Sequence, residues 1–583
     1  MQLVIKILCL LFFLIDLTLS DYPFGQTPTN ETLEVALRTQ RDVSKPIPID
    51  QLSVTGLSLS SIFQEKGYTT DSLSDLVTAL NKGSQVIMID LYWNEFTSIW
   101  QLCPAPFPQN ASSSSDTTPS LSWNNQTYKC DLNLATDNVM SMISSYIMST
   151  NTDYQANFIH VLLNLKSIHY EKSNQTISLE DAYKPNAQST SVGNSTLTET
   201  FSKLSQYIFD PSVLNDYRSQ VNSENLNEVS FYNRSSIVMP TLRTVLLNQY
   251  RRLLVNVISN DVVESRRAYT VNDLDKQLIF FNDTLPTTVL TPKNADNYCD
   301  QVLKPTNGLD LFNNLSLTTN FRYILDSDSD RFSLKKIRKY VRCGLSPVFN
   351  ATSYNVQNQT FTNSSNSNSS DVEEVYQSYA PYFFWSWGPG EPMTVDNSTT
   401  NNTDNDGQRE NVAYKCVMLR NDGWHVGDCY ERYEIACQNK SSPNDWLIPS
   451  GVKKTYFDIR AEDCPDGYNF SLPRSNIEML SLLTSIGQQN STFPIWIDLN
   501  DITISTCFVS GGPYAQCPYQ RTVTSQKFAR MIAPASVICI IVLILILMEK
   551  IFRTNHIQAN RKRYWKKKLT EYYSKNDYEG VPS

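Results

Sequence analysis

The sequence predicts an α/β fold in which a TIM-barrel-like domain is followed by a small, disulfide-rich α+β module and one C-terminal transmembrane helix. Three observations lead to this prediction. Short apolar runs alternate with helical stretches over residues 45–345, cysteine and tryptophan gather after residue 373, and an uncharged apolar stretch occupies 531–548. Repeated strand-then-helix order favours a parallel sheet, and the length of the first part suits a barrel better than a small open sheet.

The strand predictions rest on short, uniformly apolar runs, which are typical of parallel strands that are buried on both faces. We expect strands at 86–91, 158–165, 253–258 and 278–281. Apolar residues at helical spacing between these runs predict helices, the last of which opens with proline in its first turn. These helices are expected at 73–80, 136–147 and 240–250.

Both ends of the chain predict a membrane protein of the secretory pathway. Residues 1–20 carry one early lysine, Lys6, then an apolar run and small residues, which is the pattern of a cleaved signal peptide. The stretch 531–548 is uncharged and long enough to cross a bilayer. The basic cluster at 561–568 places the tail, 549–583, in the cytoplasm, where attraction to anionic lipid headgroups is expected. We therefore predict a single-pass type I membrane protein whose N-terminal bulk is luminal or extracellular.

The part between the two apolar ends is predicted to be glycosylated and disulfide-bonded. All Asn-x-Ser/Thr glycosylation sites precede 531–548. These sites are Asn30, Asn110, Asn125, Asn174, Asn194, Asn233, Asn282, Asn314, Asn350, Asn358, Asn363, Asn368, Asn397, Asn401, Asn439, Asn469 and Asn490. With Cys9 and Cys539 set aside because they fall in the apolar segments, an even number of cysteines remains, which predicts up to five disulfides. The candidates are Cys103, Cys130, Cys299, Cys343, Cys416, Cys429, Cys437, Cys464, Cys507 and Cys517.

Composition divides the ectodomain into three parts. We expect the barrel domain over 21–345, an Asn/Ser-rich glycosylated linker over 346–372 and a Cys/Trp-rich region over 373–526. A low-complexity polar tract has too little apolar surface to form a core, so the linker is expected to separate two folded units.

Charge and composition exclude several classes of function. With a net charge of −9 and a pI near 5.2, the ectodomain is not expected to bind nucleic acid. Its histidines are His160, His169 and His425, and its cysteines lack the paired spacing of a zinc site, so neither a metal nor a cofactor is expected. His160 lies inside an apolar run, and we predict a core histidine with a local hydrogen bond.

Part of the barrel domain resembles a known enzyme family. Residues 52–60 (LSVTGLSLS), followed by a helix and then by 83–90, look like the opening of the phosphatidylinositol-specific phospholipase C-like phosphodiesterase barrels, and 241–258 is similar to a later helix and strand. The resemblance implies a catalytic histidine where Ser58 stands and a catalytic arginine near Tyr92. Serine is a poor general base and tyrosine has no fixed positive charge, so we expect a barrel that has lost the catalytic activity of that family.

Two weak candidates for catalysis remain. Asp90 and Glu95 could form a carboxylate pair at the carboxyl end of a strand, which is where the active sites of such barrels lie. We expect no enzymatic activity. The alternative is a residual hydrolase that uses this pair as its acid and base.

The Cys/Trp-rich region resembles a second family. Its aromatic run at 382–392 and the later Cys416, Trp424, Cys429 and Cys437 are similar to the second half of a C-type lectin-like domain. The resemblance implies a disulfide between Cys416 and Cys429, and it leaves Cys437 to pair with an upstream cysteine such as Cys343.

The residues that bind calcium in that family are replaced in this chain. Met393 stands in the place of an asparagine, and His425 and Val426 follow the tryptophan, so two oxygen ligands are missing. We therefore expect no calcium-dependent sugar binding. The segments 464–483 and 494–499 resemble the first half of the same fold, which leaves a permuted or a duplicated domain open.

Three segments, taken with the two apolar ends, resemble one fungal family along the whole chain. They read VIMIDLYWNEFTSIWQLCPAP at 86–106, WSWGPGEP at 385–392 and CFVSGGPYAQCPY at 507–519, and together they are similar to the maintenance of telomere capping protein 6 family. The resemblance implies a type I membrane glycoprotein with a link to telomere capping. An ectodomain outside the cytosol cannot touch chromosomal DNA, so this link is expected to be indirect.

Three functions follow as hypotheses. The first is a non-catalytic cell-surface or endomembrane protein whose ectodomain binds a glycan, a lipid headgroup or a protein partner. The second is the residual hydrolase, acting on phosphodiesters or wall glycans. The third is a folding or quality-control factor whose basic tail makes the regulated contacts. Fold-level resemblance alone does not decide among them.

Overall fold

The structure is a computed structural model, and it divides the chain into two compact units, residues 1–517 and 518–583, each of which is treated by itself. The described residues are 31–110, 118–169, 182–223, 239–262, 267–285, 287–303, 321–351, 372–393, 414–519 and 525–575. The predicted signal peptide, 1–20, lies outside them.

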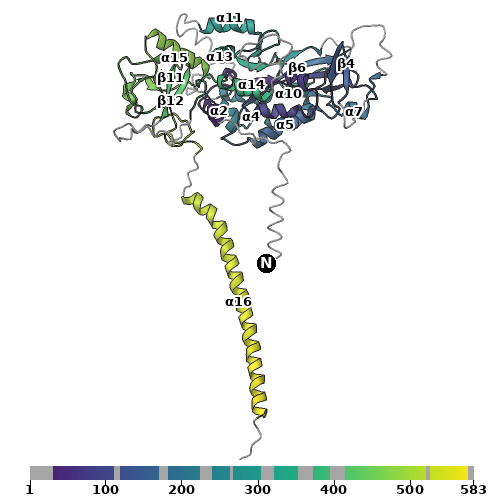
Figure 1. Cartoon of the computed structure of the whole chain (residues 1–583), viewed down its shortest axis with the longest axis vertical. Helices are drawn as coiled ribbons and strands as arrows, with labels where there is room; N and C mark the ends of the chain where they lie inside the picture. Colours follow the sequence, from purple (N-terminus) through teal and green to yellow (C-terminus); the bar gives the residue numbers. More distant parts are fainter. Residues whose placement is uncertain are drawn as a thin grey trace, which may run out of the picture. The chain divides into compact units, whose positions relative to one another are not determined.

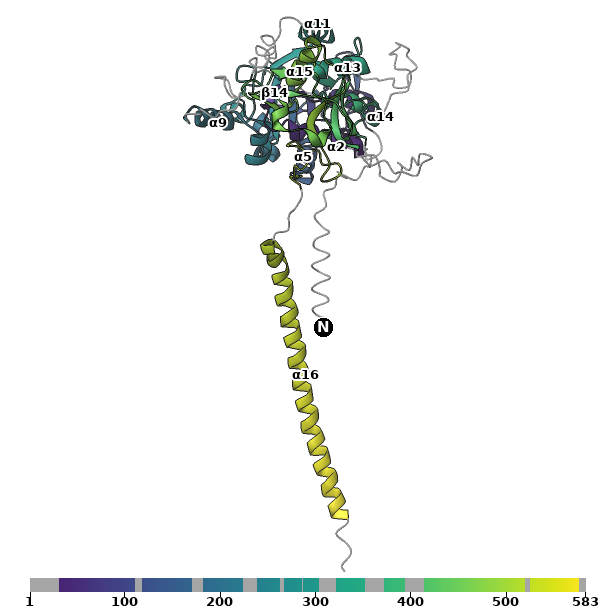
Figure 2. The same ribbon diagram turned by 90° about the vertical axis from the view of Figure 1, so that its left-hand side faces the viewer.

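A parallel barrel forms the first part of unit 1 (Figures 1 and 2). Its strands follow the sheet order β7-β6-β2-β1-β10-β9-β8, and every pair along this path is parallel. They are β1 (Gly56–Ser58), β2 (Val86–Asn94), β6 (Ile159–Ile168), β7 (Leu253–Asn260), β8 (Thr287–Leu290), β9 (Phe321–Leu325) and β10 (Ser346–Phe349). Except for β7 and β8, barrel strands that follow one another in the chain are neighbours in the sheet, and the last pairs with the first, which is the winding order of a TIM barrel.

The barrel is nearly closed between β7 and β8. At this point Phe280 forms a single parallel bridge with Asn256 of β7. Asn256 Nδ2 also donates a hydrogen bond to Thr287 Oγ1 of β8 at 2.5 Å. The strand predicted at 278–281 is thus reduced to one bridge, because helix α10 (Asp273–Leu278) occupies the start of that run. The other three predicted strands are confirmed.

Helices surround the strands (Figure 2). They are α2 (Glu31–Val43), α3 (Leu59–Lys66), α4 (Leu73–Asn81), α5 (Thr136–Ser149), α7 (Ala187–Thr190), α8 (Leu197–Thr200), α9 (Pro211–Ser223), α10, α11 (Pro292–Leu303) and α13 (Leu334–Arg342). Two of the three predicted helices, α4 and α5, are confirmed. The helix predicted at 240–250 is wrong in extent, since only a short turn containing Thr244–Asn248 forms there. Its first residues are extended instead: the Pro240 carbonyl accepts from the Ile49 N–H at 3.1 Å.

The alternation of side chains along the strands sorts the core into two layers. In β2, Val86 and Met88 join an inner cluster that includes residues from β6, β7, β9 and β10. The residues between and after them, Ile87, Ile89 and Leu91, pack with the helices in an outer cluster. Because successive side chains in a strand point to opposite faces, Asp90 and Tyr92 follow Met88 on the inner face.

A smaller α+β module follows the barrel (Figure 1, left). One sheet has the order β12-β11-β17-β13 and the other has the order β15-β14-β16. The strands are β11 (Tyr414–Arg420), β12 (Gly423–Asp428), β13 (Glu434–Ile435), β14 (Cys437–Asn439), β15 (Trp446–Leu447), β16 (Tyr468–Phe470) and β17 (Ile495–Asn500), and the helices are α14 (Val372–Tyr379) and α15 (Asn476–Gln488). Short strands on the barrel side are β3 (Ile99–Gln101), β4 (Ser120–Trp123) and β5 (Gln126–Lys129).

The predicted boundary between barrel and linker is wrong. Strand β10, at 346–349, lies between β1 and β9 inside the barrel sheet, although it falls in the range predicted as linker. One apolar cluster includes Leu80 of the barrel, Trp385 and Trp424, so barrel and module share a core rather than forming two separate units. The rest of the predicted linker, 352–371, lies outside the described residues.

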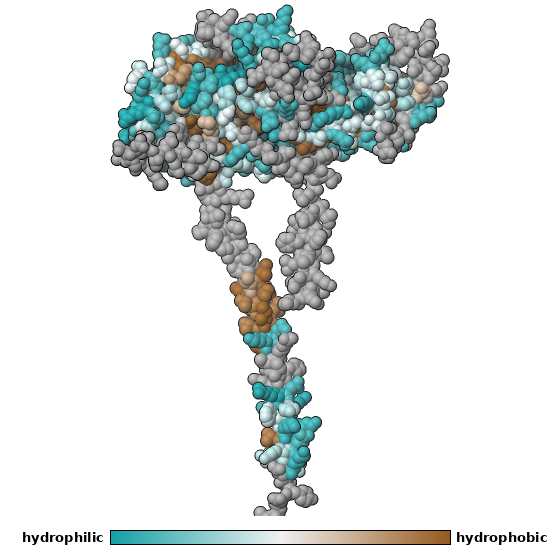
Figure 3. All heavy atoms as spheres, in the orientation of Figure 1, coloured by the Kyte–Doolittle hydropathy of each residue, from teal (hydrophilic) through white to brown (hydrophobic). Residues whose placement is uncertain are grey.

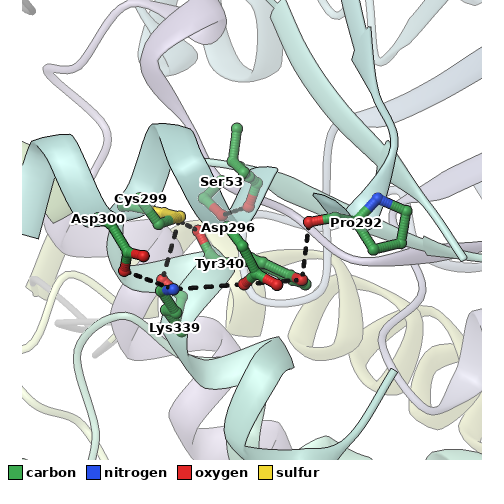
Figure 4. Close-up of a disulfide and its surroundings, with 9 residues drawn as sticks. Ser53, Pro292, Asp296, Cys299, Asp300, Lys339 and Tyr340 are labelled. Atoms are coloured by element: carbon green, nitrogen blue, oxygen red, sulfur yellow. Dashed lines mark hydrogen bonds and ion pairs between the residues drawn. A yellow bond between two sulfur atoms is a disulfide. The ribbon is translucent and has the colours of Figure 1, made fainter. Parts of the chain in front are cut away.

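Five disulfides confirm the count predicted from the cysteines. They are Cys103–Cys130, Cys299–Cys343, Cys416–Cys429, Cys437–Cys464 and Cys507–Cys517. The pairing implied for Cys416 is confirmed. The upstream partner implied for Cys437 is wrong, because β14 pairs with β16 and the chain entering β16 carries Cys464. Cys343 instead joins α13 to Cys299 of α11, beside the ion pair of Lys339 with Asp300 at 2.7 Å (Figure 4).

Unit 2 contains the helix α16 (Ser525–Lys575). Among the residues that the structure describes, no helix meets the length and apolarity that crossing a membrane requires. The first residues of the predicted span, 531–536, have side chains outside that description.

Glu478 is a fully buried acid on α15. Its side chain accepts hydrogen bonds from the Arg474 N–H at 2.8 Å and from Gln438 Nε2 at 3.2 Å. Burial raises the pKa of this carboxyl from 4.5 to about 8. The folded chain therefore keeps a proton that the unfolded chain releases above about pH 4.5.

The stability of unit 1 is expected to fall as the pH rises from about 5 to 8, because Glu478 ionises in the unfolded state and stays protonated in the folded state. Glu478→Gln stays neutral throughout, and it is expected to remove a pH-dependent loss of up to about 4 kcal/mol. Thermal unfolding of the full chain in detergent across this pH range measures the effect, with the exposed Glu462→Gln as control. An unchanged pH slope in Glu478→Gln would contradict the expectation.

Candidate functional site at the carboxyl ends of the barrel strands

The inward faces of β2 and β6 bring polar side chains together at their carboxyl ends. The parallel register pairs Asp90 with Asn164 and Tyr92 with Lys166. Partners in a parallel ladder share a face of the sheet, so all four side chains lie on the inner side of the barrel. This is the end of the barrel at which the sequence predicts a site.

Both oxygens of Asp90 have a partner on β6. Lys166 Nζ lies 2.7 Å from Oδ2 and Asn164 Nδ2 donates to Oδ1 at 2.9 Å. The Asp90 side chain is 9% exposed and that of Lys166 is 33% exposed, so the ion pair is shielded on one side and reaches solvent on the other. A carboxylate held in this way is poorly placed to act on a substrate, because both of its oxygens already accept from structural partners.

The side chain of Ser58 forms local hydrogen bonds that cap a helix. Its Oγ lies 2.6 Å from Ser60 Oγ and accepts from the Ser60 N–H at 3.3 Å, and it thereby caps the first turn of α3. Ser60 Oγ in turn donates to Asn350 Oδ1 at 3.2 Å, which links the end of β1 to the end of β10. The position at which the resemblance implies a catalytic histidine is thus filled by a helix cap.

The ring of Tyr92 lies beside the ion pair of Asp90 with Lys166. Burial raises the pKa of this phenol well above its usual value, and nearby Tyr68 and the Asp90 carboxylate add to the effect, so the hydroxyl stays neutral. Lys166 Nζ lies 5.5 Å from the centre of the Tyr92 ring, in the range of a cation–π contact. The positive charge of this site therefore comes from β6 and not from the position of Tyr92.

Neither Lys166 nor Asn164 is among the site residues predicted from the sequence. The signal that could have found them is the alternation along β6, in which positions 160, 162, 164 and 166 share one face. Asp326, which follows β9, was also not predicted. It is buried and accepts from the N–H groups of Asn350 and Ala351 at 2.5 and 2.7 Å, so it fixes the end of β10.

Glu95 has a different environment from Asp90. It follows the end of β2, and its Oε1 accepts from the Arg267 N–H at 3.3 Å. Trp93 Nε1 donates to the Arg267 carbonyl at 2.7 Å, so the same backbone position holds both side chains. Within the described residues the two carboxyl groups have separate hydrogen-bond partners and share none.

His160 lies in the core, as predicted. It is 1% exposed, and its Nδ1 forms a hydrogen bond of 2.6 Å with Tyr323 Oη inside the inner cluster. Burial lowers the pKa of the imidazole to about 3, so it is neutral. His169, at the other end of β6, has its Nδ1 2.9 Å from Ser167 Oγ.

His425 bridges two acids in the module. Its Nδ1 lies 3.1 Å from Glu391 Oε1 and its Nε2 lies 2.7 Å from Asp422 Oδ1. Burial alone would lower the pKa of the imidazole, but the hydrogen bonds to Glu391 and Asp422 outweigh it and raise that pKa. The two carboxylates thus favour the protonated form of His425, which lies between them. In the described part of the chain, no group of three or more His, Cys, Asp or Glu residues could hold a metal ion.

Comparison with known proteins identifies the family to which this chain is similar. Residues 27–370 match the sequence model of the MTC6 partial TIM-barrel domain. The chain is 52% identical over 562 residues to Maintenance of telomere capping protein 6 of Lodderomyces elongisporus, covering 95% of this chain and 91% of that protein. The chain belongs to the maintenance of telomere capping protein 6 family. The matched range includes β10, in agreement with the barrel boundary found in the structure.

Other relatives carry the same name along most of the chain. The protein of Candida albicans is 52% identical over 604 residues, with 97% of both chains covered, and that of Saccharomyces cerevisiae is 29% identical over 569 residues, with 94% of this chain and 91% of the other covered. Among solved structures, a calcium-dependent phosphoinositol-specific phospholipase C from Pseudomonas is similar with a TM-score of 0.28 and 9% identity, over 52% of this chain and 91% of that enzyme.

Removal of Lys166 is expected to leave the Asp90 carboxylate with one hydrogen-bond donor in a largely buried place. Because Lys166 is one-third exposed, Lys166→Met should cost only about 1–2 kcal/mol, or roughly 1–2 °C in Tm for a unit of this size. The double variant Asp90→Asn, Lys166→Met should recover part of this loss, since no unpaired charge remains.

Thermal unfolding of both single variants and the double variant tests this coupling. Lys203→Met is the matched control, because its ion pair with Asp137 is 46% and 45% exposed and should contribute little. Strictly additive losses in the double variant would show that Asp90 and Lys166 do not depend on each other.

Proposed function

We propose that the chain is a single-pass type I membrane glycoprotein without catalytic activity, which supports telomere capping by an indirect route. In this proposal the ectodomain binds a ligand such as a glycan, a lipid headgroup or a protein partner. The helix at 531–548 anchors it, and the tail faces the cytoplasm.

The observation that carries the non-catalytic part is the closed polar network at the carboxyl ends of the strands. Among the described residues, the candidate base and the candidate nucleophile there already have structural partners: Asp90 has Lys166 and Asn164, and Ser58 caps α3. Glu95, the second candidate acid, is bound to a backbone N–H elsewhere. General acid–base catalysis requires groups within hydrogen-bond reach of the same reacting atom, and this arrangement does not supply them.

The topology is supported by features that agree with one another. Five disulfides within 103–517 are typical of an oxidising compartment. All glycosylation sites precede the apolar stretch and the basic cluster follows it. An ectodomain in such a compartment is separated from chromosomal DNA by a membrane, so the route to telomere capping would pass through a partner.

The double variant Asp90→Asn, Glu95→Gln is expected to keep full function, because neither carboxylate takes part in chemistry. Complementation in a yeast strain that lacks its own family member measures this. The variant must accumulate and receive glycans as the wild type does, and Lys203→Met serves as a surface control. Loss of complementation by a normally folded and transported double variant would favour the residual hydrolase.

Glycan occupancy is expected to follow the exposure of each acceptor amide. Asn125 and Asn490 are exposed at turns with positive φ, whereas Asn194 Nδ2 donates to Asp137 Oδ1 at 2.9 Å and is partly buried. Asn125→Gln and Asn490→Gln should each remove one glycosidase-sensitive mass step, and Asn194→Gln should remove none. A new acceptor site placed in 576–583 should stay unmodified, and its glycosylation would overturn the proposed topology.

A further inference from the structure

The last part of α16 carries an apolar stripe that the proposed function does not use. Trp565, Leu569 and Tyr572 recur at spacings of four and three residues, so they lie on one face of the helix. Their side chains are 57%, 50% and 64% exposed. Tyr573, 68% exposed, lies beside them. We call Trp565, Leu569 and Tyr572 the tail stripe.

Positive charge surrounds the tail stripe. Within 560–575, one acidic residue, Glu571, stands among a basic set, and Lys568 is 3.9 Å from it. The basic set is Arg561, Lys562, Arg563, Lys566, Lys567, Lys568 and Lys575. Figure 3 shows the same change along α16, from an apolar stretch to a hydrophilic stretch that contains an isolated apolar patch. A basic helix with one aromatic face is a pattern that fits either a membrane surface or an apolar groove of a protein.

The continuity of α16 argues against the membrane surface. The helix is unbroken from Ser525 to Lys575. With 531–548 in the bilayer, a rise of 1.5 Å per residue puts Trp565 about 25 Å along the axis beyond Met548. A headgroup layer is only about 5–8 Å thick and charges are screened over about 8 Å, so the tail stripe stands clear of the lipid. The attraction of 561–568 to headgroups that the sequence predicts would require a bend that this helix does not have.

The charges also argue against a second copy of the chain. In a parallel helix pair with Trp565, Leu569 and Tyr572 at the seam, the flanking positions would include Lys566 and Lys568 of both helices. Like charges would then face each other on both sides of the seam, and such contacts cost several kcal/mol. A groove with an acidic rim removes this conflict, because the same lysines would pair with its carboxylates.

We infer that the tail stripe docks into an apolar groove with an acidic rim on a cytoplasmic protein. Trp565, Leu569 and Tyr572 enter the groove as the anchors of an amphipathic helix, and the basic residues pair with the rim. The inference rests on the proposed function in one respect, namely that 549–583 faces the cytoplasm. It supplies the contact by which a protein anchored in the secretory pathway acts on a process outside it.

A photo-crosslinking amino acid in the full chain, expressed in yeast, tests the docking. Placed at Leu569 it should give a protein adduct, and placed at Ser574, on the opposite face, it should give at least tenfold less. The crosslinked partner should be acidic. The yield at Leu569 should fall at least tenfold in the double variant Trp565→Ser, Tyr572→Ser. It should be unchanged in the double variant Thr570→Ala, Ser574→Ala, which is the matched control on the other face.

A second arm tests the charges. Replacement of Lys566, Lys567 and Lys568 by glutamate should reduce the crosslinking yield at Leu569 at least tenfold. The inference would be overturned by adducts with lipid alone or with a second copy of this chain alone. It would also be overturned by equal yield on both faces, by a partner that is not acidic, or by no adduct. The acceptor site in 576–583 is read in the same cells: its glycosylation overturns the proposed topology, whereas failed docking with that site unmodified overturns the docking alone.

Discussion

The parallel pairing of β2 with β6 is the interaction on which the candidate site and the barrel core both depend. It extends from Val86 opposite His160 to Asn94 opposite Ile168. Its register sends apolar side chains into the inner layer at the amino end and polar side chains into the same layer at the carboxyl end. Because Lys166 is the diagonal neighbour of Asp90 across this ladder, the two charges meet without help from any loop. A slip of β6 by one residue would turn Lys166 to the outer layer and so separate it from Asp90.

The second constraint is the core that barrel and module share. Helix α2 contacts the barrel side through Arg41, which donates to the Ala156 carbonyl at 2.7 Å. It contacts the module twice: Arg38 donates to the Thr506 carbonyl at 2.7 Å, and Gln40 Oε1 accepts from Ser386 Oγ at 2.8 Å. Aromatic side chains continue the core across the boundary, as in the contact of Phe349 with Phe383 at 5.9 Å between ring centres. The module is therefore part of the barrel's packing, and this explains why the polar tract before it does not act as a boundary between two folding units.

The ionisable groups of unit 1 differ in their environments, and two histidines show this. The two histidines with resolved pKa shifts move in opposite directions for clear reasons: His160 is buried without a charged partner and stays neutral, whereas His425 lies between two carboxylates and holds its proton more tightly. Neither combines with a nucleophile in the described residues. At the carboxyl ends of β2 and β6, the charges of Asp90 and Lys166 are likewise paired with each other.

The sequence by itself determined the α/β class, three barrel strands, two helices, the disulfide count and the role of His160, because apolar periodicity and cysteine number depend on local spacing alone. Only the tertiary structure decided the place of β10, the partner of Cys437 and the different hydrogen-bond partners of Asp90 and Glu95. Each of these depends on which distant segments become neighbours in the sheets, and no local pattern records that choice. The same holds for Lys166: its sequence position shows a charge in an apolar run, and only the register with β2 shows what that charge neutralises.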